Sequence, residues 1–254
     1  MISLVQKLVN KLQDFYVDKR VSNTELLENI PQVRYVQAGD YTMHDIPKMP
    51  PIRQQGRIGS CASHAVISAL EIQGLNQKRK EWELSELYHY YYGRKEQGTF
   101  PKATGMTMLN AVKTAKKYGV PLEFTHPYGT MEYQYNAEPG FKAKFTKDLA
   151  KPKGYRKVYS LTDVKKYINE DIPVVFGIQV YNNFRRLPAD STYHPDTNTR
   201  YEGGHAVTIV GYDDEAREFK IRNSWGKNHG EDGYFYMSYQ DVLDYGFDMY
   251  VLIL

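Results

Sequence analysis

Hydrophobic residues recur at helical spacing in three stretches of the first half of the chain. After Cys61, the sequence CASHAVISALEIQGL has apolar residues at 62, 65, 66, 69, 70 and 72, which predicts a helix with Ser60 as its N-cap. LSELYHYYYGR predicts a second helix, and TGMTMLNAVKTAKKYGV predicts a third that ends at Gly119. The segment before them, IPKMPPIRQQGRIGS, is rich in Pro and Gly and predicts extended chain and turns.

Beyond Lys153 the pattern changes to short apolar or alternating runs separated by turn residues. KVYS, IPVVFGIQVY, GGHAVTIVGYDD, EFKIRNSW and GYFYMSY predict strands, and DDEARE predicts the connection of a hairpin. The tract from Pro121 to Pro152 has little periodicity and predicts irregular chain. We therefore expect a helical lobe at about 56–150 and an antiparallel β lobe at about 151–254, with a binding groove between two lobes of unlike structure.

The first 45 residues form a leader with a pattern of their own. MISLVQKLVNKLQDF has apolar residues at helical spacing, interrupted by Lys7, Lys11 and Gln13, so it predicts an amphipathic helix rather than a signal peptide. A second short helical stretch is expected near Thr24 to Asn29. The polar face of the first helix is not especially basic, which favours docking on the main domain, residues 46–254, over a membrane surface.

Composition and charge narrow the function classes. The chain has 41% hydrophobic and 25% charged residues, as ordinary globular proteins do, and its net charge of +3 comes from scattered basic residues that do not indicate nucleic-acid binding. No apolar run approaches the roughly 20 residues of a membrane span. One cysteine allows no intrachain disulfide, which fits a reducing compartment at least as well as secretion. Dispersed histidines give no metal-ligand spacing, so no metal or other cofactor is expected.

Cys61 is the first candidate for chemistry. It opens a predicted helix directly after Gly59 and Ser60. The free amide groups and the dipole at a helix start lower the pKa of a thiol, and small neighbours leave the sulfur accessible. A lone cysteine is nevertheless more often a small buried hydrophobe, so this position alone does not predict a nucleophile.

His205, in GGHAVTIVGY, favours a nucleophilic role for Cys61 over a structural one. A histidine whose pKa lies near neutrality can pair with a thiolate and later return a proton to a leaving amine. His64 is the nearest rival, but it should point from the same helix into the packed protein. The remaining histidines lack comparable surroundings: His44, His89, His126, His194 and His229.

Two side chains are expected to support this pair. A hairpin between 205–212 and 218–223 would bring Asn223 beside His205, where its amide oxygen could orient the imidazole and Trp225 could cover that hydrogen bond. Gln55 lies six residues before Cys61, so its amide and the Cys61 N–H are natural donors to an oxyanion. Spacing alone does not choose between Gln55 and Gln54.

Three segments together resemble the papain-like C1 cysteine peptidases: QGRIGSCASHA, GGHAVTIVGY and IRNSWGKNHGEDGYFYM. The resemblance runs from about Pro51 to the C-terminus and implies an α+β papain-like fold, with the active-site cleft between its two lobes. It favours Gln55 over Gln54. The roles that it implies are nucleophile for Cys61, base for His205, orienting residue for Asn223, oxyanion donor for Gln55 and shield for Trp225.

The resemblance also implies substrate-binding residues in the cleft, namely Gly105, Met106 and Gly204. Several positions depart from the family pattern. Ile58 stands where the family often has a disulfide-bonded cysteine, and Ala62 stands where an aromatic residue is usual. Met106 replaces a glycine, so we expect a narrower subsite there. In its GGHAV segment and its lack of disulfide bridges, the sequence is similar to bacterial and viral members of the family.

The activity that the resemblance implies is that of a thiol protease, a cysteine endopeptidase acting on polypeptide substrates through an acyl-enzyme. Family members are commonly zymogens, so residues 1–45 are expected either to restrain the site as an intramolecular inhibitory segment or to complete the fold elsewhere. Two alternative functions are open. One is a thiol acyltransferase or deconjugase using the same dyad, and the other is an inactive peptide-binding relative, which the intact Gln, Cys, His and Asn set disfavours.

Overall fold

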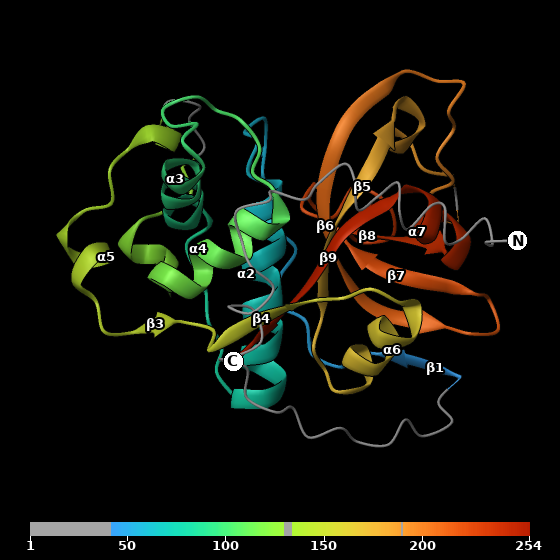
Figure 1. Ribbon diagram of the computed structural model, residues 1–254, viewed down its shortest axis with the longest axis horizontal. Coiled ribbons are helices and arrows are strands. Elements are labelled where there is room, and N and C mark those ends of the chain that lie inside the picture. Colours follow the sequence, from blue (N-terminus) through green and yellow to red (C-terminus); the bar gives the residue numbers. More distant parts are fainter. Residues whose placement is uncertain (1–41, 130–133, 189) are drawn as a thin grey trace, which may run out of the picture. The chain divides into compact units, whose positions relative to one another are not determined.

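A computed structural model describes residues 42–129, 134–188 and 190–254, in which helix α2 runs between a helical lobe and a β lobe (Figure 1). The helix predicted over MISLVQKLVNKLQDF and the one predicted near Thr24 to Asn29 lie outside the described residues. The α+β two-lobe class predicted from the sequence is confirmed. No helix among the described residues has the length and apolar character that crossing a membrane requires.

The helical lobe is built on the three predicted helices and a π-helical turn: α2 (Cys61–Gln73), η1 (Gly74–Lys78), α3 (Glu86–Gln97) and α4 (Met108–Tyr118). Side-chain caps start two of them, because Ser85 accepts a hydrogen bond from the Tyr88 amide and Thr107 accepts one from the Asn110 amide. Ser60 occupies the N-cap position of α2, as predicted. Ser60 makes no side-chain cap, since its hydroxyl has another partner described below.

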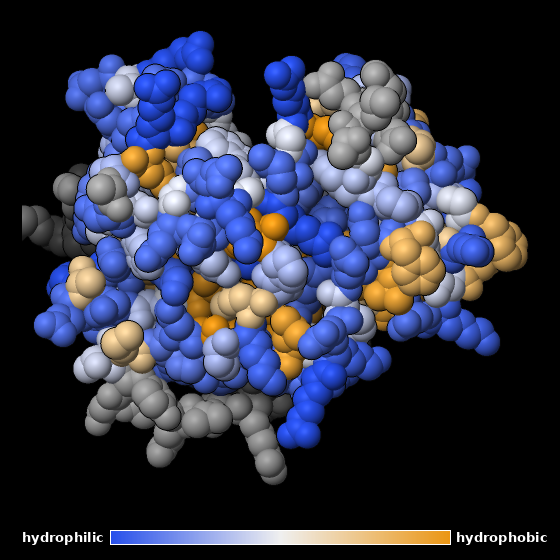
Figure 2. Space-filling model, turned by 180° about the vertical axis from the view of Figure 1, so that it is seen from behind, coloured by the Kyte–Doolittle hydropathy of each residue, from blue (hydrophilic) through white to orange (hydrophobic). Residues whose placement is uncertain are grey.

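The tract expected to be irregular carries several short elements: β2 (Val120–Pro121), η2 (Glu123–Thr125), η3 (Gln134–Asn136), α5 (Phe141–Phe145) and β3 (Leu149–Ala150). α5 lies at the outer edge of the helical lobe (Figure 1), and its Phe141 and Phe145 are exposed. Figure 2 shows the opposite side of the molecule, where most surface side chains are hydrophilic, the upper edge is notched, and apolar groups lie in scattered patches.

Within the described residues, the β lobe contains seven strands and two helices: β1 (Met43–Asp45), β4 (Gly154–Lys157), α6 (Leu161–Asn169), β5 (Val174–Tyr181), β6 (Tyr201–Asp213), β7 (Glu218–Arg222), β8 (Tyr234–Ser238), α7 (Tyr239–Tyr245) and β9 (Gly246–Ile253). A 3-10 turn, η4 (Asn182–Arg185), follows β5. The strands pair antiparallel in the order β4-β9-β5-β6-β7-β8, and β1 pairs with β6. α2 and α6 both pack against β5 and β6, which explains why these strands are nearly continuous apolar runs.

The differences from the sequence prediction are informative. β1 lies within residues 1–45, the predicted leader, yet it pairs with β6 in register His44↔Tyr212. β4 starts before the predicted KVYS strand, because Gly154–Lys157 is the part that pairs with β9. α6, α7 and β9 were not predicted. α6 begins at a capping Ser160 and buries Val164, Tyr167 and Ile168, a helical spacing visible in the sequence.

Candidate active site

Cys61 is the first residue of α2 and is half-buried at the junction of the lobes. Burial raises the pKa of its thiol. Backbone amides of Ala206, Ala62 and Cys61 itself donate toward the sulfur and lower the pKa in part. The Ala206 amide comes from β6, and this strand therefore places the residue next to His205 against the thiol.

The imidazole of His205 is buried, and its Nε2 lies 2.8 Å from Oδ1 of Asn223. The predicted hairpin makes this contact, because β6 and β7 pair in register Thr208↔Arg222 and Asn223 follows directly. The Trp225 ring lies 5.0 Å from the imidazole between ring centroids. The Trp225 ring therefore packs beside the imidazole that bonds to Asn223.

Burial lowers the pKa of His205 to about 4, although the hydrogen bond to Asn223 acts in the opposite direction. With the thiol pKa raised as well, both shifts favour uncharged partners in the resting site. The thiolate–imidazolium pair expected from the sequence is thus opposed by burial, and the amides around Cys61 and the oxygen of Asn223 are what support it.

The loop that precedes Cys61 is held by close backbone contact and by one tyrosine. A Cβ at Gly59 would lie 3.0 Å from the Gly105 amide nitrogen, so a side chain there would push the loop away from Gly105. Ser60 Oγ lies 2.7 Å from Tyr128 Oη, and that hydroxyl donates to the Gln55 carbonyl at 2.7 Å. Tyr128 therefore ties both ends of the loop together.

Gln55 and Gln54 differ clearly in their surroundings. Gln55 is buried, its Oε1 accepts from the Ser224 hydroxyl at 2.7 Å, and its Nε2 donates to the Ile58 carbonyl at 3.0 Å. The Gln55 amide is thus oriented toward the loop that leads to Cys61. Gln54 is exposed and its backbone bridges to Trp225. The geometry favours Gln55 as the donor.

The three predicted substrate-binding positions do not behave alike. Gly105 and Gly204 are exposed, as a surface for substrate requires. Met106 is only 9% exposed and belongs to the core of the helical lobe. A Cβ at Gly93 of α3 would lie 2.1 Å from the Met106 sulfur, so this side chain packs inward against α3. The prediction of a narrower subsite at Met106 is therefore wrong, because the Met106 side chain fills the space above Gly93.

Two contacts of the site are not predicted by the sequence. The surroundings of His229 in the sequence indicate no role in the site, yet its Nδ1 lies 3.0 Å from Nδ2 of Asn223. Tyr128 comes from a tract without periodicity, so nothing local pointed to its role. His64 agrees with the prediction, since it is buried against Tyr128 and bonds to the Ser60 carbonyl.

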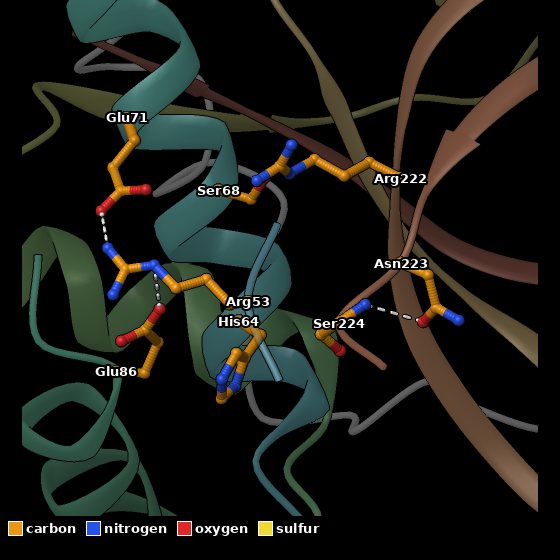
Figure 3. A pocket seen from close by; sticks show the side chains of 8 residues that line it. All are labelled: Arg53, His64, Ser68, Glu71, Glu86, Arg222, Asn223 and Ser224. Atoms are coloured by element: carbon orange, nitrogen blue, oxygen red, sulfur yellow. Dashed lines mark hydrogen bonds and ion pairs between the residues drawn. The ribbon is translucent and has the colours of Figure 1, made fainter. Parts of the chain in front are cut away.

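A small pocket lies behind these residues, between α2 and the end of β7 (Figure 3). Its volume of about 10 Å³ is room for roughly one water molecule. Asn223 and Ser224 form one side of it, and Arg53 with its carboxylate partners lies opposite. The pocket therefore separates the hydrogen-bonded site from a charged group of residues.

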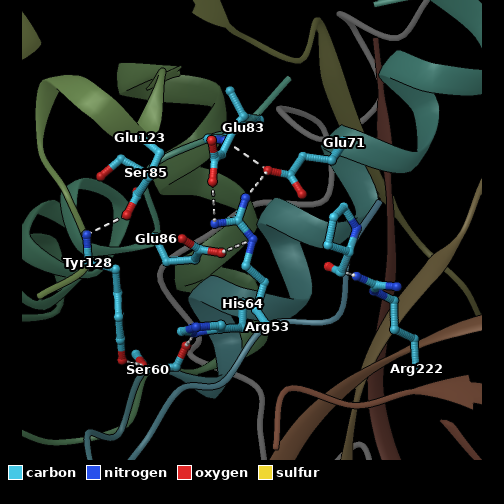
Figure 4. A network of polar contacts seen from close by, with 12 residues as sticks. Arg53, Ser60, His64, Glu71, Glu83, Ser85, Glu86, Glu123, Tyr128 and Arg222 are labelled. Carbon is cyan, nitrogen blue, oxygen red and sulfur yellow. Dashed lines mark hydrogen bonds and ion pairs between the residues drawn. The ribbon is translucent and has the colours of Figure 1, made fainter. Parts of the chain in front are cut away.

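Those charged residues form what we call the Arg53 cluster: Arg53, Glu71, Glu83 and Glu86 (Figure 4). Arg53 lies 2.9 Å from Glu71 Oε1 and 3.4 Å from Glu86 Oε1. Burial raises the pKa of both carboxyls to about 7, and the repulsion between them adds to the shift of Glu71. Among the residues that the structure describes, no group of three His, Cys, Asp or Glu side chains could hold a metal ion.

Comparisons with known proteins agree with this architecture. A family model described as "Papain family cysteine protease" matches residues 38–253. An uncharacterized peptidase C1-like protein of Acanthamoeba polyphaga mimivirus is 29% identical over 203 residues, which cover 75% of this chain and 65% of the relative. A cathepsin L-like proteinase of Fasciola hepatica is 28% identical over 195 residues, covering 74% of this chain and 56% of the relative. The chain thus spans less than two thirds of the length of both.

A solved structure gives a fuller match. Xylellain, a cysteine protease from Xylella fastidiosa, superposes with a TM-score of 0.80 at 31% sequence identity. The match covers 92% of this chain and 93% of that one. A Carica candamarcensis cysteine protease in complex with E-64 shares the fold with a TM-score of 0.66 at 24% identity.

Proposed function

Because this chain belongs to the papain family of cysteine proteases, we propose that it is an endopeptidase with Cys61 as nucleophile and His205 as base. The observation that carries the proposal is the 2.8 Å contact between His205 Nε2 and Asn223 Oδ1. In this contact Nε2 donates a hydrogen bond to the oxygen, so Nδ1 of the neutral ring is an acceptor. Such a ring can take the proton of a neighbouring thiol.

The reaction then proceeds in two halves. The Cys61 sulfur attacks the carbonyl carbon of the scissile bond while its proton passes to Nδ1 of His205, and the C–N bond breaks as that proton moves to the leaving amine. Water then attacks the thioester carbon while one of its protons passes to His205, the C–S bond breaks to release the acid product, and that proton moves to the Cys61 sulfur. No cofactor enters the balance.

The charge that forms on the carbonyl oxygen needs donors in place before the reaction. We assign this role to the Gln55 amide and the Cys61 N–H, because α2 begins at Cys61 and the Gln55 side chain is held at both ends. Fixed donors of this kind cost no reorganisation when the charge appears.

The test is labelling with an epoxide-type thiol inhibitor together with turnover of short peptide substrates. We expect one inhibitor molecule per chain, located on Cys61 by mass spectrometry, and no label or turnover in Cys61→Ser. His64→Gln serves as the matched control, because it changes a buried histidine of the same helix that we place outside the chemistry. Labelling away from Cys61, or turnover that survives Cys61→Ser, would overturn the proposal.

We also propose that residues 1–45 restrain the site, because their first 15 residues carry an amphipathic pattern with no other evident task. Deletion of residues 1–40 keeps β1, which pairs with β6 and belongs to the β lobe. We expect faster inhibitor labelling and higher peptide turnover in the truncated protein. Equal rates in the two forms would show that this segment only completes the fold.

A further inference from the structure

His229 lies in the loop between β7 and β8 and touches the candidate site through two hydrogen bonds. Its Nδ1 is 3.0 Å from Asn223 Nδ2, and its Nε2 is 2.8 Å from the carbonyl oxygen of Phe184. His205, Asn223, His229 and the Phe184 carbonyl thus form one continuous row, which we call the imidazole–amide chain. Its side chains are buried or half-buried.

The hydrogen bond from Ser224 identifies which atom of the Asn223 amide is the oxygen. The Ser224 backbone N–H donates to Asn223 Oδ1 at 2.8 Å, and a backbone N–H can only donate. The atom beside Ser224 must therefore be the amide oxygen. It follows that His205 Nε2 carries a proton and that Asn223 Nδ2 faces His229 as a donor.

The Phe184 end leads independently to the same arrangement. A carbonyl oxygen can only accept, so His229 Nε2 must carry the proton that it shares with Phe184. In a neutral ring this leaves Nδ1 as an acceptor, which is what the Asn223 amide requires. Burial lowers the pKa of His229 and so keeps its ring neutral.

We propose that His229 is a positioning residue that locks the Asn223 amide and thereby holds His205 in the tautomer whose Nδ1 accepts the Cys61 proton. The inference rests on the proposed function for its catalytic meaning. Without His229 the amide loses the acceptor for its NH₂ group, and a flipped amide would point a donor at Nε2–H of His205. The ring would then favour the other tautomer, with a proton on the nitrogen that has to receive one.

A simple packing role is the competing explanation, because the His229 ring also contacts aromatic neighbours. Its centroid lies 4.8 Å from that of Phe184 and 4.8 Å from that of Trp225. Packing alone would be served by any flat ring of similar size. A hydrogen-bonding role would instead be served by a smaller side chain that keeps an acceptor near Nδ1. The two explanations therefore predict opposite rankings of substitutions.

The first experiment compares His229→Phe with His229→Asn in the full chain, using peptide turnover. His229→Phe keeps a ring but offers Asn223 no acceptor, and we expect kcat to fall about tenfold or more with KM nearly unchanged. His229→Asn can place its amide oxygen near the former Nδ1 and should stay within about threefold of wild type. If His229→Phe is as active as wild type, or His229→Asn is as poor as His229→Phe, the proposal fails.

A second readout does not depend on activity. Long-range ¹H–¹⁵N spectra report the tautomer of His205 in a Cys61→Ala background, where we expect a proton on Nε2. Adding His229→Phe should shift population toward the Nδ1–H form, and an unchanged tautomer would overturn the positioning role. If the tautomer shifts while the wild-type protein cleaves no peptide, the proposed function fails and the positioning role stands. If His229→Phe does not fold, His229→Leu gives the same test, because its side chain also offers Asn223 no acceptor.

Discussion

The imidazole–amide chain and the Arg53 cluster lie on opposite sides of one small pocket, and they keep polar side chains from water in different ways. The imidazole–amide chain is neutral, and each of its side chains has a donor facing an acceptor. The Arg53 cluster sets one cation against three carboxylates, two of them buried. Glu86 Oε2 has no hydrogen-bond partner among the described residues.

This difference has a physical consequence for what each network controls. A neutral chain anchored on backbone groups has little charge to desolvate, so its loss changes orientation more than stability. A buried ion cluster costs free energy to desolvate and depends on every partner being present. We therefore expect substitutions in the Arg53 cluster to act mainly on the free energy of unfolding and its pH dependence, and substitutions beside the imidazole–amide chain to act mainly on catalysis.

Removing the cation of the Arg53 cluster should cause the largest loss in the free energy of unfolding. Arg53→Met leaves the carboxylates of Glu71 and Glu86 buried without their cation, and removing one partner of a buried ion pair costs about 3–5 kcal/mol. The loss in the free energy of unfolding should be full at pH 8, where these carboxyls are ionised. It should be smaller at pH 5, because burial raises their pKa to about 7 and protonated carboxyls need no cation.

Urea denaturation at both pH values measures this loss. Lys220→Met is the matched control, because Lys220 pairs with Asp45 at 2.7 Å near the surface and such pairs contribute only about 0–1 kcal/mol. A loss for Arg53→Met no larger than that of Lys220→Met would show that the cluster does not depend on its cation.

The next effect concerns catalysis. Gln55→Ala removes the proposed oxyanion donor, and such a change lowers kcat about 10²- to 10³-fold. Stability should fall by only about 1 kcal/mol, since the Ser224 hydroxyl loses one hydrogen-bond partner. Gln54→Ala is the control from the neighbouring position, because its side chain is exposed and its bridge to Trp225 uses the backbone. Steady-state kinetics should separate the two variants clearly, and equal kcat values would remove Gln55 from the mechanism.

What could be foreseen from the sequence follows from local rules. Helical spacing after Cys61 set the start of α2, and a short hairpin connection brought Asn223 to His205 by register alone. Both depend on residues close in sequence or on regular pairing. The papain family and its α+β fold were recognised from these same segments and are confirmed.

What could not be foreseen depends on contacts between distant irregular segments. Tyr128 reaches Ser60 across 68 residues of chain from a tract without periodicity. Met106 turns inward only because Gly93 of α3 leaves room for its sulfur. His229 acts through a hydrogen-bond direction that two backbone groups determine, and no spacing in the sequence encodes that direction. The ion pairs of Arg53 with Glu71 of α2 and Glu86 of α3 likewise could not be inferred, because they join segments that are distant in sequence.

The pH dependence of stability should show a smaller effect. The carboxyls of Glu71, Glu86 and Glu123 have a pKa of about 7 in the folded protein, mainly because burial disfavours their charge, against about 4.3 in an unfolded chain. Between these values the folded state binds more protons, so its stability falls as pH rises through about 7. Buried His64, His89 and His205 act oppositely, since burial lowers the pKa of each to about 4 and stability rises with pH only up to about 6.5.

Comparing each variant with the wild-type protein between pH 6.5 and 8.5 isolates the contribution of one of these carboxyls, because the histidines titrate alike in both proteins. Glu86→Gln removes one of them, and the fall in the free energy of unfolding across this range should shrink by about 1 kcal/mol. Glu83→Gln removes a carboxylate of the same cluster that is 74% exposed, and it should change the fall less than Glu86→Gln does. Denaturation curves at pH 6.5, 7.5 and 8.5 test both variants. If the free energies of unfolding of the two variants fall equally with pH, the burial of Glu86 does not set its charge. The contrast between a charged cluster and a neutral chain would then lose its basis.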